Sequence, residues 1–311
     1  MRKQAILLYN AYAGHRTIVG EIDRITEKLQ ALDYELRLHR SVGTGDIQSY
    51  ILEGVEQKNT DLILISGGDG TVNECISAMC EKGLDIPLMI LPLGTANDFA
   101  NSAGLPSSVD ECLDLITHGQ LDYIDVGKAN DKYFINVCNM GLFSGVSHTV
   151  DSELKKKFGR LAYYFKGLEE FQNYQAMDMT LTVDDEVLHD QYLLILVFNG
   201  KGAGGMLKLA KHAEIADGKF DVVCIKNLNL FEMPALMLKV LQGEHLKDVN
   251  VDYLTGSHIK IECHNLENNT FVTDVDGEAG PSLPMEIEVL SHKIRVYLPK
   301  SEEREGKIPF I

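Results

Sequence analysis

The sequence is poor in positive charge. Its 311 residues include 29 Lys and Arg but 46 Asp and Glu, which gives a formal net charge of -17. This excess of acid argues against a general nucleic-acid binder, because phosphate backbones need a basic surface. Nucleic acid is therefore not a predicted partner, although a local basic patch is not excluded.

Cysteine is also sparse. None of the six cysteines forms a CxxC pair or has a histidine at zinc-ligand spacing, and their sequence neighbours are mostly apolar. The pattern favours buried free thiols over disulfides or a zinc site. Free thiols suit a reducing cytoplasm, so a cytoplasmic location is expected.

Long hydrophobic runs are missing. No segment approaches the roughly 20 apolar residues of a spanning helix, so any membrane contact is expected to be peripheral. The start, Met1-Arg2-Lys3 followed by apolar Ala5–Tyr9, superficially resembles a secretory signal. Its apolar part is too short and no small-residue cleavage site follows, so we interpret it as a buried strand.

Several common catalytic signatures are absent as well. The sequence contains no Walker A pattern GxxxxGK[ST], no HExxH, no GxSxG and no HRDxxxxN. It therefore gives no support to a P-loop nucleotidase, a zinc protease, a nucleophile-elbow hydrolase or a protein kinase.

The first part of the chain alternates strand and helix patterns, which predicts a largely parallel, doubly wound α/β sheet with helices on both faces. The expected strands are Ala5–Tyr9, Tyr34–His39, Asp61–Ile65, Leu88–Leu91 and Leu121–Val126. The expected helices are Ile18–Leu32, Ile47–Glu56, Val72–Cys80, Asn97–Ala103 and Val109–Ile116.

After about residue 128, strand patterns follow one another with few helices, which predicts an antiparallel β-sandwich or barrel. We expect a first domain over 1–127 and a β-rich second domain over 128–299; the tail 300–311 could return to the first. The expected strands are Phe134–Cys138, Met179–Val183, Tyr192–Phe198, Phe220–Cys224, Ile259–Cys263, Phe271–Val275, Ile287–Val289 and Ile294–Leu298, with helices at Leu154–Phe171 and Met233–Leu241.

The strongest motif is Gly67-Gly68-Asp69-Gly70-Thr71-Val72-Asn73-Glu74, which follows the apolar run Leu62–Ile65 and precedes a helical pattern. Glycines allow close backbone approach, and a helix start offers free N–H groups, so the segment predicts a phosphate site. The alternative is a strand-to-helix turn that only needs flexible residues.

A second glycine-containing loop, Pro92–Ala100, follows the next strand. Thr95 can cap the following helix and donate to a phosphate, and Asp98 lies in its first turn. Capping alone would explain Thr95. It would not explain why this loop, Gly67–Glu74, Asn10–Gly14 and Ser41–Asp46 all follow parallel strands and so share one sheet edge, where ligands collect.

Together GGDGTVNE and PLGTANDFA resemble the ATP-binding signatures of the diacylglycerol kinase catalytic family, which includes sphingosine and ceramide kinases and is similar in fold to NAD kinases. The resemblance covers nearly the whole chain and is greatest to the soluble bacterial lipid kinases. Asn10–Gly14 resembles the family's NPxSG loop with Ala11 in place of proline, and Asn101 stands where the family often has arginine.

The resemblance implies ATP and Mg²⁺ as cofactors. The implied ATP-binding residues are Asn10, Ala11, Tyr12, Ala13, Gly14, Thr44, Gly67, Gly68, Asp69, Gly70, Thr71, Val72, Asn73, Glu74 and Thr95. The implied catalytic magnesium residues are Asp69, Asp98 and Asp125, the last at the end of its strand.

A structural magnesium site is implied at Glu214, Asp217 and Lys219, where the Asp217 carboxylate binds the metal and the other two residues use main-chain oxygens. Oxygen ligands suit Mg²⁺. A hairpin turn is the alternative, because Asp-Gly is a strong turn signal.

The acceptor side of the reaction is expected at Asp276-Gly277-Glu278. A carboxylate there could accept the proton of a lipid hydroxyl during its attack on the γ-phosphate. By itself this tripeptide indicates a turn. With the family resemblance, a catalytic role is the favoured interpretation. Glu278 is the preferred base and Asp276 the close second.

We therefore predict an ATP-dependent lipid kinase, with diacylglycerol as acceptor and phosphatidic acid as product. The alternatives are a NAD kinase-like phosphotransferase and a nucleotide-binding regulator without turnover. The basic and aromatic stretch Lys155–Lys166 could meet anionic lipid at a membrane surface, or be a solvated helix. A homodimer is compatible with the sequence, but no feature indicates one.

Overall fold

The chain folds into two compact units. The structure, a computed structural model, describes residues 2–13, 17–142, 176–204, 206, 208–229, 231–265 and 272–301. One unit comprises the chain up to Val126 and from Ser291 onward, and the other comprises Gly127–Leu290. The division differs from the predicted one because the end of β15 (Met285–Leu298) pairs in parallel with β4 through Val296 and Leu88.

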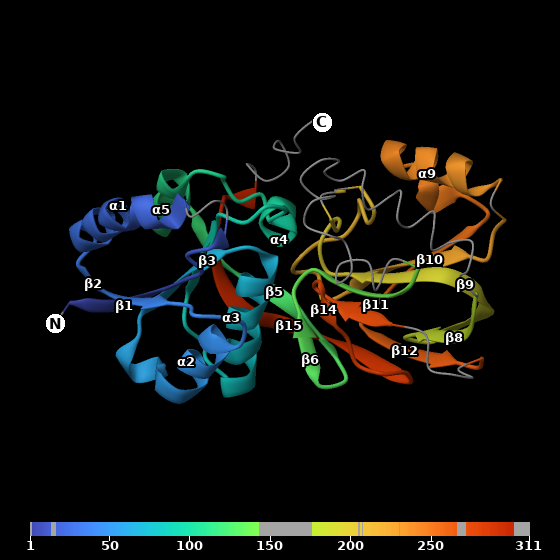
Figure 1. The fold of residues 1–311 in the computed structure, drawn as a ribbon, viewed down its shortest axis with the longest axis horizontal. Coiled ribbons are helices and arrows are strands. Elements are labelled where there is room, and N and C mark those ends of the chain that lie inside the picture. The colour runs from blue at the N-terminus through green and yellow to red at the C-terminus, as the bar shows by residue number, and fades with distance from the viewer. Residues whose placement is uncertain are drawn as a thin grey trace. The chain divides into compact units, whose positions relative to one another are not determined.

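The first unit is the predicted doubly wound sheet. Strands β4, β3, β1 and β2 are hydrogen-bonded neighbours in that order, and every pair is parallel. Helices α1 and α5 cover one face of this sheet, and α2 and α3 cover the other (Figure 1). The elements are β1 (Lys3–Tyr9), α1 (Thr17–Ala31), β2 (Tyr34–Arg40), α2 (Asp46–Gly54), a 3₁₀ turn (Gln57–Asn59), β3 (Leu62–Gly67), α3 (Asp69–Lys82), β4 (Leu88–Pro92), α4 (Asp98–Ser102), α5 (Val109–His118) and β5 (Gln120–Ala129).

Central strands of this sheet are buried on both faces. Every residue of β3 and β4 is buried, as is the stretch of β1 from Ala5 to Tyr9. Such continuous burial is expected where helices cover both sides of a parallel sheet, and it explains why these strands are unbroken apolar runs. The strand edge that carries the loops is thereby held on a rigid frame.

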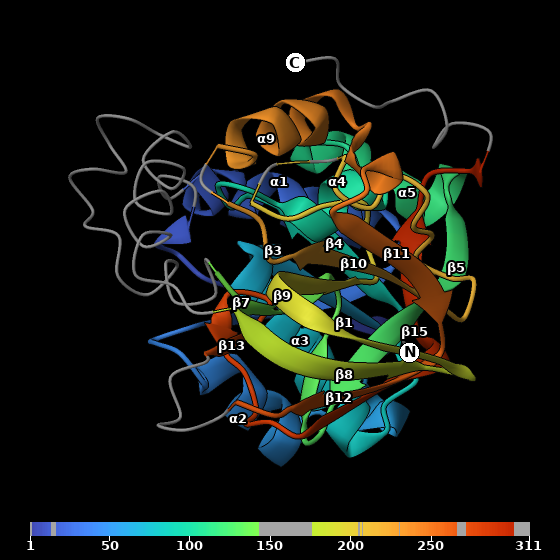
Figure 2. The same ribbon diagram turned by 90° about the vertical axis from the view of Figure 1, so that its right-hand side faces the viewer.

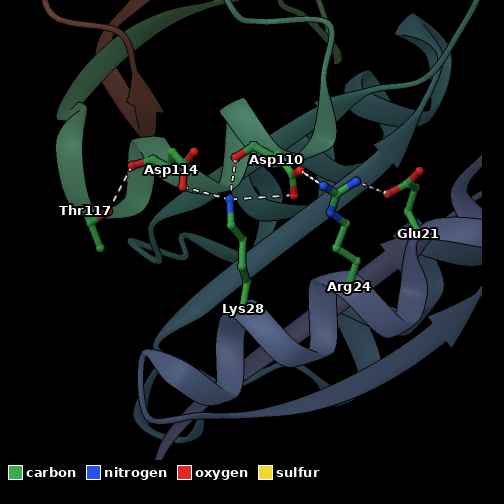
Figure 3. Close-up of polar contacts among 6 residues, drawn as sticks. All are labelled: Glu21, Arg24, Lys28, Asp110, Asp114 and Thr117. Carbon is green, nitrogen blue, oxygen red and sulfur yellow. Dashed lines mark hydrogen bonds and ion pairs between the residues drawn. The ribbon is translucent and has the colours of Figure 1, made fainter.

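An ionic cluster fastens the two helices on one face of the first unit (Figure 3). Lys28 of α1 binds the Asp114 carboxylate at 2.7 Å and the Asp110 main-chain oxygen at 2.9 Å. Arg24 forms an ion pair with Asp110, which also lies in the first turn of α5. Asp110 therefore faces two cations and the positive end of its own helix.

The second unit is an antiparallel β-structure with two cores. One core lies inside the sandwich and includes the stacked rings of Phe134 and Phe220, whose centroids are 5.3 Å apart. The other lies under α9, which covers the sheet near β9 and β10 (Figure 2). The elements are β6 (Lys132–Phe134), β7 (Val137–Gly141), β8 (Met177–Val183), β9 (Glu186–Phe198), β10 (Phe220–Lys226), α9 (Met233–Gln242), a 3₁₀ turn (His245–Lys247), β11 (Val251–Gly256), β12 (His258–Cys263), β13 (Thr273–Val275) and β14 (Glu278–Ala279).

Three strand predictions for the second half need correction. The expected strand Phe134–Cys138 is broken into β6 and β7, because the N–H groups of Ile135 and Asn136 bind a carboxylate instead of a neighbouring strand. Strand β15 is continuous where two strands were expected, and β11 was not predicted. The predicted helix Leu154–Phe171, the start of Phe271–Val275 and the tail 302–311 lie outside the described residues.

The thiol prediction is confirmed. All six cysteines are free, and all except the half-buried Cys263 are buried. Burial raises the pKa of the Cys80 and Cys112 thiols to about 12, so both are protonated and unreactive at neutral pH.

We predict that Asp110→Ala lowers the free energy of unfolding by ~1 kcal/mol, because it removes both ion pairs and a helix-start carboxylate. Glu21→Ala removes only the far end of the cluster, a 3.9 Å contact with Arg24, and should change stability by less than ~0.5 kcal/mol. Urea titrations at low and high salt measure both effects. Equal losses for the two variants, or no attenuation by salt, would contradict the assignment.

Candidate active site

The turn between β3 and α3 is shaped by its glycines. A Cβ on Gly67 would lie 2.5 Å from the Thr71 side chain, so this position has no room for one. Gly68 is extended and α3 begins at Asp69. A Cβ on Gly70 would meet nothing within 4 Å in the described structure, although glycine weakens a helix. Open space over Gly70 leaves the helix start accessible to a ligand.

The loop between β4 and α4 is braced by Asn97. Its Oδ1 accepts from the Gly94 N–H at 2.9 Å, and its Nδ2 donates to the main-chain oxygens of Pro92 and Gly94 at 3.0 and 3.2 Å. Asn97 is itself left-handed, with φ 51°, a region in which asparagine is enriched. The asparagine of the motif therefore shapes the loop.

These two loops touch through their glycines. A Cβ on Gly94 would lie 2.3 Å from the Gly68 Cα, so the two backbones are in direct contact. The Asp69 carboxylate then reaches the start of α4, where it accepts a long hydrogen bond, 3.4 Å, from the Phe99 N–H. Asp69 supplies this contact, and among the described residues no side-chain cap hydrogen bond is found at the start of α4, where Thr95 is exposed.

Burial dominates the electrostatics of Asp69. It raises the pKa of the carboxyl above its ordinary value, and the N–H groups of Phe99, Asp98 and Asn97 oppose this shift only in part. An ionised Asp69 therefore lies in a poorly solvated position. A cation bound beside it would offset the cost.

The other predicted ATP-binding segments lie at the same edge of the sheet. Asn10 donates its N–H to the Ser66 oxygen at 2.9 Å, and its Oδ1 accepts from the Tyr12 N–H at 2.9 Å, which closes the loop after β1. Ala11 is buried, Tyr12 and Thr44 are exposed, and Gly14 lies outside the described residues. Glu74 accepts from the Gln48 N–H at 3.1 Å and so caps α2.

A small pocket opens where the β3 and β4 loops meet. Its empty volume is about 190 Å³, including open solvent. It is lined by Gly68, Asp69, Val72, Ile90, Pro92, Asn97, Phe99 and Ala100. The combination of apolar walls, one carboxylate and exposed glycine backbone is suited to a phosphate-bearing ligand.

The three predicted catalytic metal residues are not gathered into one cluster. Asp69 and Asp98 meet at the start of α4, because the Asp98 N–H faces the Asp69 carboxylate. Asp125 is fully buried in the middle of β5, not at its end, and its Oδ1 accepts from the His292 N–H of β15 at 2.8 Å. Within the described ranges, no three His, Cys, Asp or Glu side chains form a ready metal site.

The predicted structural metal site is a tight turn. Asp217 accepts from the Lys219 N–H at 3.0 Å, and Gly218 is left-handed with φ 75°. The turn leads into β10, but the described residues before it form no strand, so it is not the hairpin that the sequence offered as the alternative. The neighbouring Asp221 is an acidic residue that we did not predict. Burial raises the pKa of the Asp221 carboxyl, and the carboxylates of Asp217 and Glu214 raise it further. The sequence did contain a signal for Asp221, because it is a charged residue within the apolar strand β10.

The tripeptide Asp276-Gly277-Glu278 forms the end of a hairpin between β13 and β14. Asp276 and Gly277 have φ values of 49° and 89°, as a two-residue turn with both central residues left-handed requires. Asp276 accepts from the N–H groups of Ile135, Asn136 and Val137 at 2.7, 3.1 and 2.8 Å. These donors stabilise the ionised carboxylate, which makes it a poor proton acceptor.

Glu278 has the opposite environment. Its side chain is exposed, and within the part of the chain that the structure describes no hydrogen bond or ion pair occupies its carboxylate. The turn anchored by Asp276 thus holds Glu278 at the hairpin edge while leaving it free to react. The two carboxylates, which the sequence could not separate, have different surroundings.

The fold defines a class of protein: a doubly wound α/β unit followed by an antiparallel β-unit. The family model for the diacylglycerol kinase catalytic domain matches residues 4–129, and that for the YegS C-terminal NAD kinase beta sandwich-like domain matches residues 136–298. Both matches agree with the predicted fold class.

Comparison with whole proteins gives the family. The chain is 32% identical over 305 residues to a diacylglycerol kinase of Staphylococcus saprophyticus, covering 98% of each chain. It is 30% identical over 304 residues to a diacylglycerol kinase of Bacillus subtilis, covering 97% of this chain and 99% of the relative. A solved structure of a candidate diacylglycerol kinase from Bacillus anthracis strain Sterne is 28% identical, with a TM-score of 0.80 over 96% of this chain and 95% of that one.

The chain belongs to the diacylglycerol kinase family, and it is an ATP-dependent lipid kinase. The predicted resemblance and enzyme class are thereby confirmed.

We predict that Gly94→Ala and Gly70→Ala separate folding from ligand binding. The alanine at 94 should cost about 1–3 kcal/mol of stability, because its Cβ overlaps the Gly68 backbone. The alanine at 70 should leave stability unchanged or raise it by up to ~1 kcal/mol, yet weaken ATP binding at least about tenfold by occupying the open helix start. Thermal unfolding and equilibrium ATP binding test the pair, and unimpaired binding by Gly70→Ala would contradict a phosphate at this turn.

We predict a trade between stability and activity at Asp69. Because burial raises its folded-state pKa, the associated stability is present at pH values below the ordinary aspartate pKa and is lost as the pH rises through the folded value. Asp69→Asn should therefore be at least as stable as the wild type at pH 7, with an advantage that shrinks towards pH 4, while losing kinase activity. Denaturant midpoints across this range measure the trend; a variant less stable at pH 7 would refute it.

Proposed function

We propose that the lipid acceptor is diacylglycerol and that the product is phosphatidic acid. The proposal is carried by the whole-length similarity to relatives that bear the name diacylglycerol kinase at 30–32% identity. The first unit would hold ATP at the glycine loops after β3 and β4. The second would present the carboxylate that activates the acceptor.

Glu278 is the general base of this proposal. It takes the proton of the lipid hydroxyl while the hydroxyl oxygen bonds to the γ-phosphorus of ATP and the bond from that phosphorus to the β-phosphate oxygen breaks, releasing ADP. Its exposed and unengaged carboxylate supports the role. Asp276 is a positioning residue, because its three backbone hydrogen bonds hold the hairpin that carries Glu278.

Magnesium would be held near the nucleotide by Asp69 and Asp98, with Asp125 further along β5. These are hard oxygen donors, and Asp69 is a buried carboxylate that a cation would stabilise. When bound, the cation offsets phosphate charge as it develops in the transfer. Mg²⁺ commonly uses one or two carboxylates together with water and substrate phosphates, so Asp69 and Asp98 would suffice as protein ligands.

A second cation is proposed at Asp217 with the main-chain oxygens of Glu214 and Lys219. The oxygen donors of this turn support it, because carboxylate and main-chain oxygens are the ligands that Mg²⁺ prefers. This site would stabilise the second unit and take no part in phosphoryl transfer. Contact with a membrane surface would follow from the lipid substrate. The stretch Lys155–Lys166 lies outside the described residues. A homodimer stays a prediction.

Transfer of labelled phosphate from ATP to diacylglycerol in mixed micelles tests the proposed function. Glu278→Gln should lower kcat by about 10²–10⁴ without loss of stability, as expected for removal of a general base. Asp276→Asn should lower kcat and also cost about 1–3 kcal/mol of stability, because one of the two accepting oxygens becomes an NH2 donor that faces a backbone N–H group. NAD serves as the alternative acceptor in the same assay. Phosphorylation of NAD in place of diacylglycerol would overturn the acceptor, and a fully active, folded Glu278→Gln would overturn the base.

A further inference from the structure

Helix α9 of the second unit is apolar on two opposite faces. Met233, Leu236 and Val240 are buried in the core beneath the helix. On the opposite side, Phe231, Pro234, Ala235, Leu238 and Leu241 are exposed and recur at helical spacing. We call these five residues the α9 outer face. Of its large side chains, Phe231 is 92% exposed, Leu238 is 56% exposed and Leu241 is 60% exposed.

The helix presents this face from a well-defined frame. Asn229 and Glu232 form a reciprocal capping box: the Asn229 Oδ1 accepts from the Phe231 and Glu232 N–H groups, and the Glu232 carboxylate accepts from the Asn229 N–H at 3.0 Å. At the other end, left-handed Gly243 closes the helix. The exposed apolar side chains therefore sit on an ordered element, with both ends fixed.

Lysines gather around the C-terminal end of α9. The Lys211 Nζ donates to the Gly243 oxygen at 3.1 Å, and the Lys208 side chain passes close enough to Gly243 that a Cβ there would lie 3.2 Å from it. Lys239 pairs with Asp248 at 2.6 Å, and Lys247 lies in the next turn of the chain. With the four lysines, the acidic Glu232, Glu244 and Asp248 of the same segments leave one positive charge among these seven side chains, in a chain of net charge -17.

We propose that the α9 outer face docks the enzyme on an anionic lipid bilayer, with Phe231, Leu238 and Leu241 entering the interface and the lysines meeting the headgroups. This inference rests on the lipid-kinase assignment and extends it. An amphiphilic acceptor resides in a bilayer, and none of the helices in the described ranges is long and apolar enough to span one. Apolar side chains beside cations are what binding to an anionic interface requires.

A second copy of the chain fits this face less well than a bilayer does. A two-fold contact places the same patch on both sides of the interface. The lysines around Gly243 would then face their own copies. Anionic lipid headgroups, in contrast, would attract these lysines.

Vesicle flotation without ATP tests the docking surface, using vesicles of phosphatidylcholine alone and of equal parts phosphatidylcholine and phosphatidylglycerol. Leu238→Ser combined with Leu241→Ser should weaken partitioning to the anionic vesicles by about tenfold or more. Val187→Ser is the matched control, because Val187 is 62% exposed on β9 of the same unit. It should bind like the wild type. Phe231→Ser, at an almost fully exposed position, gives a second variant without a packing role.

The lysine contribution is tested separately. Lys208→Gln combined with Lys247→Gln should weaken binding to the anionic vesicles by about fivefold per lysine and leave binding to the neutral vesicles unchanged. Wild-type-like flotation of the folded leucine double variant would overturn the proposal. So would a lipid-free dimer, seen by sedimentation velocity, that the same double variant dissociates.

Activity toward a short-chain diacylglycerol dissolved below its micelle concentration separates this inference from the proposed function. The leucine double variant should retain the wild-type rate there and lose activity only on vesicles. Loss of the rate in solution would show that the α9 outer face serves the reaction itself, and would overturn its assignment to docking. A wild-type enzyme that binds vesicles but phosphorylates no diacylglycerol in either form would overturn the proposed acceptor and leave the docking surface standing.

Discussion

The contact between the backbones of Gly68 and Gly94 is the constraint on which the nucleotide half depends. Parallel strands bring their carboxyl ends to one edge, but side chains normally keep the following loops apart. Here both loops lack a Cβ at the point of approach. The start of α4 can therefore come within reach of the Asp69 carboxylate. Asn97 keeps the second loop folded around this contact. The proposed phosphate site would thus arise from close packing of main chain more than from any single charged side chain.

In the proposed mechanism, the two carboxylates of one hairpin have different roles on the acceptor side. Asp276 receives three N–H donors from the chain around Asn136, which fixes the hairpin and stabilises its own negative charge. A carboxylate so engaged cannot readily take a proton. Glu278 lies two residues further on, and its side chain is exposed to a ligand. Structure and reactivity are assigned to different side chains, which is why the asparagine variant at 276 and the glutamine variant at 278 are expected to fail in different ways.

The sequence predicted local structure around the motifs, but it did not predict contacts between residues far apart in the chain. The strand, glycine turn and helix around Gly67–Glu74 follow from adjacent residues, and the structure has all three. The contacts of Asp276 are with N–H groups about 140 residues away, and Asp125 accepts from the N–H of His292, which is 167 residues away. Periodicity carries no information about such partners. Because sequence patterns do not reveal distant partners, the hydrogen bond between Asp69 and the start of α4 was not predicted. For the same reason, the strand that is broken at Ile135 was expected to be continuous.

The large negative charge of this chain restricts which part of its surface can face an anionic bilayer. A chain of net charge -17 is repelled by an anionic surface as a whole. At physiological ionic strength the repulsion is screened beyond roughly 8 Å, so the charges nearest the membrane dominate. A local patch with a small positive balance and an apolar centre can therefore bind while the rest of the acidic surface turns away. The two-sided apolarity of α9 follows from the same reasoning, because one face is buried in protein and the other has lipid as its most favourable surroundings.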